Sequence, residues 1–257
     1  IYTNPAVTEK KSLIEDDLAP KITCVSCHSS EPHKYDSKMN DHTDKVSCQA
    51  CHIPRYARVN PTKMSWDWSK AGKLKDGKPY HEDGELGKPI YKSIKGAFTW
   101  DKNIVPEYYW FNGSLSSTTA RDTIDPSKPV KVSHPVGDKD DSDSRIFPFK
   151  IHNAKVPYDK VNKTLLAPLL SGKHGYWTTF DMPDAIARGN KTLDIPFSGE
   201  FDYVDSTYAF PITHMVAPKT SALNCTECHI RENGRIANLA GIYLPGRDRL
   251  PILDNLG

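Results

Sequence analysis

All six cysteines of this 257-residue chain occur in pairs separated by two residues, and a histidine follows each pair directly. Thiols and imidazoles in this pattern suit three kinds of chemistry: a structural zinc site, a redox-active dithiol, or covalent attachment of haem with an axial imidazole. The three motifs are Cys24-x-x-Cys27-His28, Cys48-x-x-Cys51-His52 and Cys225-x-x-Cys228-His229.

The histidine that follows each pair distinguishes these possibilities. Histidine makes up 10 of 257 residues, so chance alone places one after all three pairs with a probability of about (10/257)³, or roughly 6 × 10⁻⁵. Zinc ribbons and redox dithiols do not need that histidine, and Cys225/Cys228 lacks a partner pair for a four-cysteine zinc site. The sequence therefore predicts three covalently attached haem c groups, with His28, His52 and His229 as proximal iron ligands.

The spacing within each motif has a geometric reason. Two cysteines three residues apart lie on one side of a helical turn, so both reach the vinyl groups of one porphyrin, and the adjacent histidine meets the iron. All six cysteines are used in this way, so no disulfide is expected. Because c-type cytochromes mature outside the cytoplasm, we expect a periplasmic or extracellular protein.

The distal iron ligands are predicted to come from other histidines, which would give low-potential, six-coordinate irons. His33 and His42 lie between the first two motifs, His214 precedes the third, and His152 lies among aromatic residues. These four candidates compete for three irons, so one of them is expected to be structural or to bind the iron of another chain. The remaining histidines are predicted to be solvated surface residues: His81, His134 and His174.

Composition supports a core filled partly by something other than side chains. Hydrophobic residues make up only 37% of the chain, and proline is frequent at 20 residues. The formal net charge of +2 does not predict a nucleic-acid partner. No apolar run is long enough to span a membrane, and the first residues do not resemble a secretory signal.

The predicted fold class is a multihaem cytochrome c, mostly irregular, with short α-helices and few short strands wrapped around a haem core. Glycine and proline recur every few residues of the haem-free middle, which argues against long regular elements. The chain is expected to form one haem-organised domain, 1–257, with three parts: a di-haem segment (20–56), a wrap rich in aromatic residues and proline (57–205), and a third-haem segment (206–257).

A few regular elements are expected within this arrangement. Short helices are predicted at 6–19 and at 181–188, the second with Asp181 as N-cap and Gly189 as its end. Short strands are predicted at 92–100 and 200–208.

Several runs of the sequence carry a resemblance to known proteins: His42–Pro54, Pro61–Met64, Trp66–Ser69, Pro106–Gly113, Phe147–His152, Gly175–Trp177 and Pro211–Lys219. These runs resemble the octahaem tetrathionate reductase-type cytochromes, within the hydroxylamine-oxidoreductase-like group. The similarity is to the C-terminal half of that family and covers nearly the whole chain. The resemblance supports His42, His152 and His214 as ligands, with His33 next.

The family's lysine-ligated catalytic haem lies in its N-terminal portion, which has no counterpart here. The resemblance therefore implies the electron-wiring half, and reduction of tetrathionate, nitrite or hydroxylamine is not carried over. No catalytic residue is predicted.

The main functional hypothesis is a trihaem cytochrome that transfers electrons to redox partner proteins. A second hypothesis is an extracellular filament, a nanowire in which copies of the chain share a histidine ligand. A third hypothesis is enzymatic: one five-coordinate or lysine-ligated iron reduces a sulfur or nitrogen oxyanion. Alternatively, the chain is the electron-wiring part of a larger octahaem oxyanion reductase, in association with other multihaem chains.

Overall fold

The computed structural model describes residues 24–230, 232–239 and 241–242. The chain divides into two compact units, Ile1–Cys48 and Gln49–Gly257, and each is described by itself. The helix expected at 6–19 lies outside the described residues. The prediction of one haem-organised domain stays a prediction.

The described part of the first unit consists of short helical turns. They are the 3-10 turn η2 (Cys24–Ser26), helix α1 (Ser37–Asp41) and the 3-10 turn η3 (His42–Asp44). The carboxylate of Asp36 accepts a hydrogen bond from the Met39 backbone N–H at 3.1 Å and so caps α1. The unit ends at the first residue of helix α2 (Cys48–His52).

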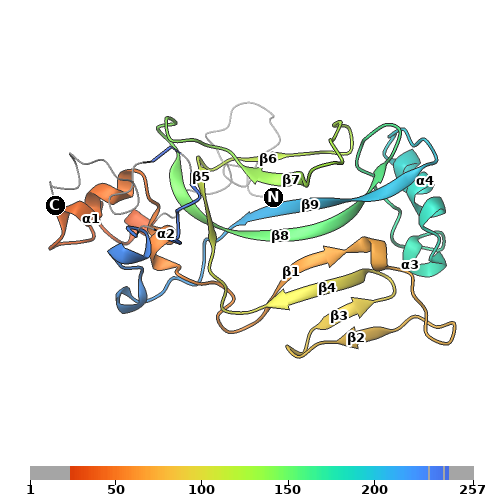
Figure 1. Ribbon diagram of the computed structural model, residues 1–257, viewed down its shortest axis with the longest axis horizontal. Helices are drawn as coiled ribbons and strands as arrows, with labels where there is room; N and C mark the ends of the chain where they lie inside the picture. The colour runs from red at the N-terminus through yellow and green to blue at the C-terminus, as the bar shows by residue number, and fades with distance from the viewer. Residues whose placement is uncertain (1–23, 231, 240, 243–257) are drawn as a thin grey trace, which may run out of the picture. The chain divides into compact units, whose positions relative to one another are not determined.

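The second unit is built on a mixed sheet of nine described strands, in which β2-β3-β4-β1-β8-β9-β7-β6 are neighbours and β5 pairs with β8 (Figure 1). The two longest strands, β8 and β9, run antiparallel with paired residues from Phe149↔Pro211 to Asp159↔Phe201. The strands are β1 (Thr62–Asp67), β2 (His81–Asp83), β3 (Pro89–Lys92), β4 (Gly96–Asp101), β5 (Glu107–Phe111), β6 (Leu115–Ser117), β7 (Val130–Pro135), β8 (Arg145–Asp159) and β9 (Phe201–Pro211).

The expectation of few short strands is therefore wrong, because the haem-free middle of the chain forms an extensive sheet with strands of up to 15 residues. Proline was the misleading signal. A proline lacks only the N–H donor, so it is tolerated in a strand wherever that donor is not needed. Inside β8, the Pro148 carbonyl accepts from Ile212 N at 3.0 Å and the Pro157 carbonyl from Leu166 N at 3.1 Å.

Helices α3 (Tyr176–Thr179) and α4 (Met182–Thr192) lie together beside one end of β8 and β9 (Figure 1). As predicted, Asp181 caps α4, accepting from Asp184 N at 2.9 Å. The helix continues through Gly189 to Thr192, so Gly189 does not end it. This glycine instead allows close packing, since a Cβ there would lie 1.9 Å from the Ala167 carbonyl oxygen.

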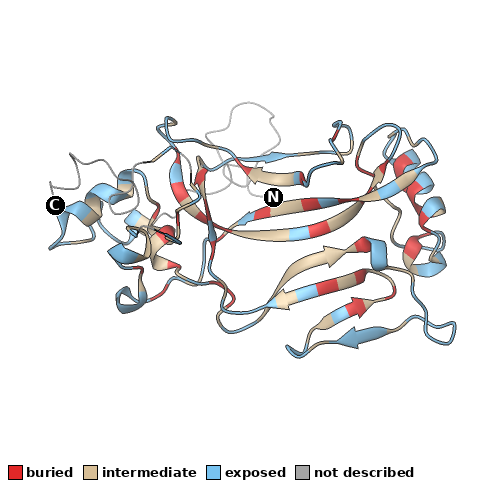
Figure 2. Ribbon diagram, viewed as in Figure 1, coloured by how far each residue is buried: buried red, intermediate tan, exposed pale blue. Residues whose placement is uncertain are grey.

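Among the described residues, buried side chains form several clusters (Figure 2). One cluster packs Trp68 against α3 and α4. Another cluster packs Ile53 and Tyr56, which come just after the second cysteine motif, against Ile212. The second cluster matters most for the site, because it fixes the chain directly after α2 to the residue that follows β9.

Candidate functional site

Each cysteine motif forms a single helical turn. His28 N and His229 N donate to the carbonyls of Cys24 and Cys225, both at 2.8 Å, and the middle motif is helix α2. All six thiols are free of disulfide bonds. Each pair is exposed or half-buried, so a large planar group can reach both sulfur atoms. These residues fit covalent haem c, which needs two thiols and an imidazole on one turn.

The structure brings the second and third attachment turns together within the second unit. After leaving β9, the chain returns to α2, where Ala217 N donates to the His52 carbonyl at 2.7 Å and Leu223 N donates to the Cys51 carbonyl at 3.0 Å. The third motif begins two residues after Leu223. Two motifs that are far apart in the sequence thus share one hydrogen-bonded region.

Arg235 strengthens this connection. Its Nη1 donates to the Pro54 carbonyl at 2.7 Å, and its Nη2 donates to Oε1 of Glu227, also at 2.7 Å. Pro54 follows the second motif and Glu227 lies inside the third. The Arg235 side chain is only 13% exposed, so these charge-assisted hydrogen bonds are largely shielded from water.

Glu227 also closes the third attachment turn. Its side chain accepts from Asn224 N at 3.2 Å in a capping box. Burial alone raises the pKa of Glu227, but the hydrogen bonds from Arg235 and Asn224 outweigh it, so this pKa lies below its ordinary value. Sequence reasoning missed both Arg235 and Glu227. The Asn224-x-x-Glu227 spacing was the available signal for the cap, whereas nothing local marks Arg235.

Tyr108 of β5 contacts the same region. Its hydroxyl donates to the Ala50 carbonyl inside α2 at 3.3 Å. Burial raises the pKa of Tyr108 to about 12, and the nearby Arg235 partly opposes that effect. The phenol is therefore protonated at neutral pH and acts as a hydrogen-bond donor to the second attachment turn.

Three of the four candidate distal histidines share one hydrogen-bond pattern. His42 Nδ1 donates to the Lys38 carbonyl at 2.6 Å, and His152 Nδ1 to the Lys63 carbonyl at 3.2 Å. His33 Nδ1 lies 3.0 Å from the side-chain oxygen of Asn40. A carbonyl oxygen only accepts, so Nδ1 carries the hydrogen and Nε2 carries the lone pair.

That tautomer is the one in which a histidine binds iron through Nε2, and a carbonyl on Nδ1 is the usual outer partner of a metal-bound imidazole. In two histidines predicted to be surface residues, Nε2 instead lies close to a charged side chain. His134 Nε2 lies 3.4 Å from Lys131 Nζ, and His81 Nε2 lies 4.0 Å from the Asp83 carboxylate. The pattern favours the candidates, whose assignment as ligands stays a prediction.

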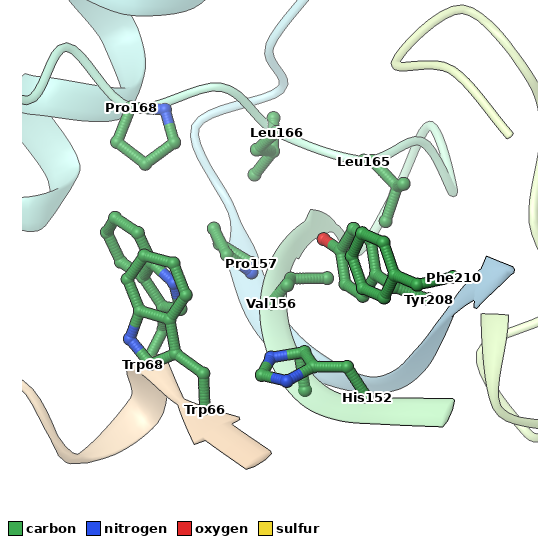
Figure 3. Close-up of a pocket in the computed structure, with 11 residues that line it drawn as sticks. Trp66, Trp68, His152, Val156, Pro157, Leu165, Leu166, Pro168, Tyr208 and Phe210 are labelled. Atoms are coloured by element: carbon green, nitrogen blue, oxygen red, sulfur yellow. The ribbon is translucent and has the colours of Figure 1, made fainter. Parts of the chain in front are cut away.

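His152 lies in an apolar pocket of about 370 Å³ on the sheet (Figure 3). The stacked rings of Trp66 and Trp68, 4.7 Å between centroids, line one side, and Tyr208 and Phe210 line another. Burial is the main cause that lowers the pKa of His152. The imidazole is therefore neutral at physiological pH, which iron ligation requires.

A second pocket, of about 520 Å³, contains the exposed His214 together with Met215 and Lys150. Phe210 lines both pockets. No attachment cysteine lines either one. This is the arrangement expected of distal residues, because they approach a haem from the face opposite its attachment turn.

Comparison with known proteins points to multihaem cytochromes c. The family described as bacterial cytochrome c matches residues 63–232. The structure is similar to the crystal structure of octaheme cytochrome c from Shewanella oneidensis, with a TM-score of 0.75 and 41% sequence identity. The similarity covers 81% of this chain and 48% of that one, so this chain spans about half the length of its relative. No curated protein matches.

These matches support a multihaem cytochrome c fold and covalently bound haem c. Among the described helices, none has the length and apolar character needed to cross a membrane.

Proposed function

Because the chain belongs to the bacterial cytochrome c family, we propose that it transfers electrons outside the cytoplasm through three covalently attached haem c groups. The second and third attachment turns carry this proposal. Electron tunnelling falls off steeply with distance, so a wire needs cofactors held close together. The hydrogen bonds from Ala217 N and Leu223 N to α2, together with Arg235, support close placement of two of the haems.

When bound, the haem iron supplies a one-electron ferric–ferrous couple. The chain's own residues anchor the porphyrins through the six cysteines and supply proximal imidazoles from His28, His52 and His229. The distal imidazoles are proposed to come from among His33, His42, His152 and His214. The carbonyl groups of Lys38 and Lys63 orient two of these candidate rings.

The likeness to an eight-haem protein favours a second candidate function. In it, these three haems form the electron-wiring part of a larger multihaem reductase. Purification from the native source distinguishes the two candidates. Stable co-purification of further haem-bearing polypeptide supports the larger reductase. A three-haem protein that purifies on its own supports the trihaem electron carrier.

Polymerisation remains a hypothesis that only the surplus fourth histidine favours. Negative-stain electron microscopy of the haem-loaded protein tests it directly. Discrete particles over a wide concentration range would count against a filament.

Low-temperature EPR of the fully oxidised protein, quantified against iron and covalent haem, tests the main proposal. We expect three haems per chain, all low-spin with bis-histidine signals. A high-spin or amine-ligated iron would indicate an exchangeable site and would overturn the pure electron-transfer function.

A further inference from the structure

The lysines on and directly after β8 differ in their partners. Two of them lie near carboxylates: Lys155 Nζ is 3.6 Å from Asp205, and Lys160 Nζ is 3.4 Å from Glu200. Lys150, which is half-buried on the same strand as Lys155, has none among the described residues. The half-buried ammonium group of Lys150 therefore has no counter-ion among the residues that the structure describes.

The contacts of Lys150 are neutral. Its Nζ donates to the Thr62 hydroxyl at 2.7 Å and lies 5.8 Å from the centre of the Phe210 ring. Removing an ammonium group from water without an opposite charge costs free energy that one hydroxyl does not return. The geometry therefore calls for an anionic group that none of the described residues supplies.

A second half-buried lysine has the same property. Lys63 Nζ lies 3.9 Å from the centre of the Phe98 ring and 5.1 Å from that of Trp66, and no described carboxylate pairs with it. Its carbonyl orients His152, two residues after Lys150. This face of the sheet is thus positively charged beside a candidate iron ligand.

The position of Lys150 indicates which anion would pair with it. Lys150 lines the pocket of about 520 Å³ that also contains His214, a candidate distal ligand. That volume is within the range of about 300–1,000 Å³ for sites that hold small molecules and cofactors. A haem carries both groups that these side chains could bind. Its iron can take an imidazole as ligand, and its propionate carboxylates can pair with a cation.

We propose that Lys150 forms an ion pair with a propionate of a haem whose distal face lies in this pocket. The inference rests on the proposed function, since it requires covalent haem. Reduction adds an electron to the haem, and a fixed positive charge nearby stabilises the reduced form. Lys150 therefore raises the reduction potential of that haem.

Spectroelectrochemical titration of the haem-loaded protein tests this. The variants are Lys150→Met, the charge-conserving Lys150→Arg, and the matched control Lys155→Met on the same strand. We expect Lys150→Met to lower the potential of one haem and to shift its propionate bending band in the resonance Raman spectrum. Lys150→Arg and Lys155→Met should leave both unchanged. If Lys150→Met does not fold, Lys150→Gln replaces it with the same expectation.

A haem-loaded Lys150→Met protein with unchanged potentials, or one that shifts no more than Lys155→Met, would overturn the inference while leaving the proposed function intact. Failure of the wild-type chain to bind haem covalently would instead overturn the proposed function. A free oxyanion is the other source of negative charge. Titration with sulfate tests it, and potentials that depend on sulfate in the wild type but not in Lys150→Met would exclude the propionate pair.

Discussion

Arg235 donates two hydrogen bonds to one oxygen of Glu227, from Nε at 3.1 Å and from Nη2 at 2.7 Å. Its backbone N–H also donates to the Glu227 carbonyl at 2.9 Å. Through Nη1 the same side chain reaches the Pro54 carbonyl, just after the second attachment turn. One arginine therefore contacts both the second and the third haem-attachment regions, in addition to the backbone hydrogen bonds that join them.

Replacing this arginine should loosen that arrangement. We expect Arg235→Met to lower the free energy of unfolding by about 2 kcal/mol, because Glu227 keeps its burial and loses its charged partner. Chemical denaturation of the haem-loaded protein measures this. Arg188→Met is the control, since the Arg188–Asp184 pair is exposed and its loss should change little.

The same variant has an electronic consequence that a purely structural role would not produce. We expect the magnetic interaction between two ferric haems, seen as broadening in the EPR spectrum, to weaken in Arg235→Met. An unchanged spectrum in a destabilised protein would show that Arg235 contributes to stability alone.

Among the carboxylates of the sheet, we expect substitution of Asp159 to cause one of the largest losses of stability. It is fully buried and accepts hydrogen bonds from the backbone N–H groups of Val161, Asn162 and Ser198. We expect Asp159→Asn to cost about 2–3 kcal/mol, because the amide cannot accept this whole set. Thermal unfolding measures the loss, and Asp125→Asn in an exposed turn serves as the control.

Asp159 also predicts how stability depends on pH. Burial alone raises its pKa, but the hydrogen bonds from Asn162, Ser198 and Val161 outweigh it and hold the pKa below the ordinary value of 3.8. Its contribution is therefore fully present above the unfolded pKa and is lost as the pH falls through the lower folded value. Unfolding at a series of pH values below 5 should show a shallower decline in Asp159→Asn than in the wild type.

The distal candidates predict a spectroscopic result. Removing a true axial ligand, as in His152→Ala or His42→Ala, should convert one low-spin iron to a high-spin or open form. His81→Ala should leave every signal unchanged, because the exposed His81 lies beside Asp83. Ultraviolet–visible and EPR spectra of the oxidised proteins provide the readout. Full low-spin signals in both His152→Ala and His42→Ala would remove these residues from the ligand set.

Gly189 provides a test of packing between α4 and the segment around Ala167. A Cβ at this position would lie 1.9 Å from the Ala167 carbonyl oxygen. We expect Gly189→Ala to destabilise the fold by about 1–3 kcal/mol, although alanine favours helices. Lys191→Ala, at an exposed position of the same helix, should be nearly neutral in the same denaturation experiment.

Sequence alone predicted the haem-attachment turns and the N-cap of α4, because these depend on contacts within five residues. His229 N donates to the Cys225 carbonyl, and the Asp181 carboxylate accepts from Asp184 N. Neither hydrogen bond involves a distant part of the chain. The same local reasoning placed a strand at 200–208, close to the observed β9.

Only the tertiary structure decided the sheet and the connection between attachment turns. The long β8–β9 pairing depends on partners about 50 residues apart, and the prolines that argued against it retain their carbonyl acceptors. The bonds that Arg235 makes to Pro54 and Glu227 exist because the chain returns from β9 to α2. Such contacts join residues that are far apart in the sequence. A pattern within one segment contains no information about its distant partner, so it cannot predict them.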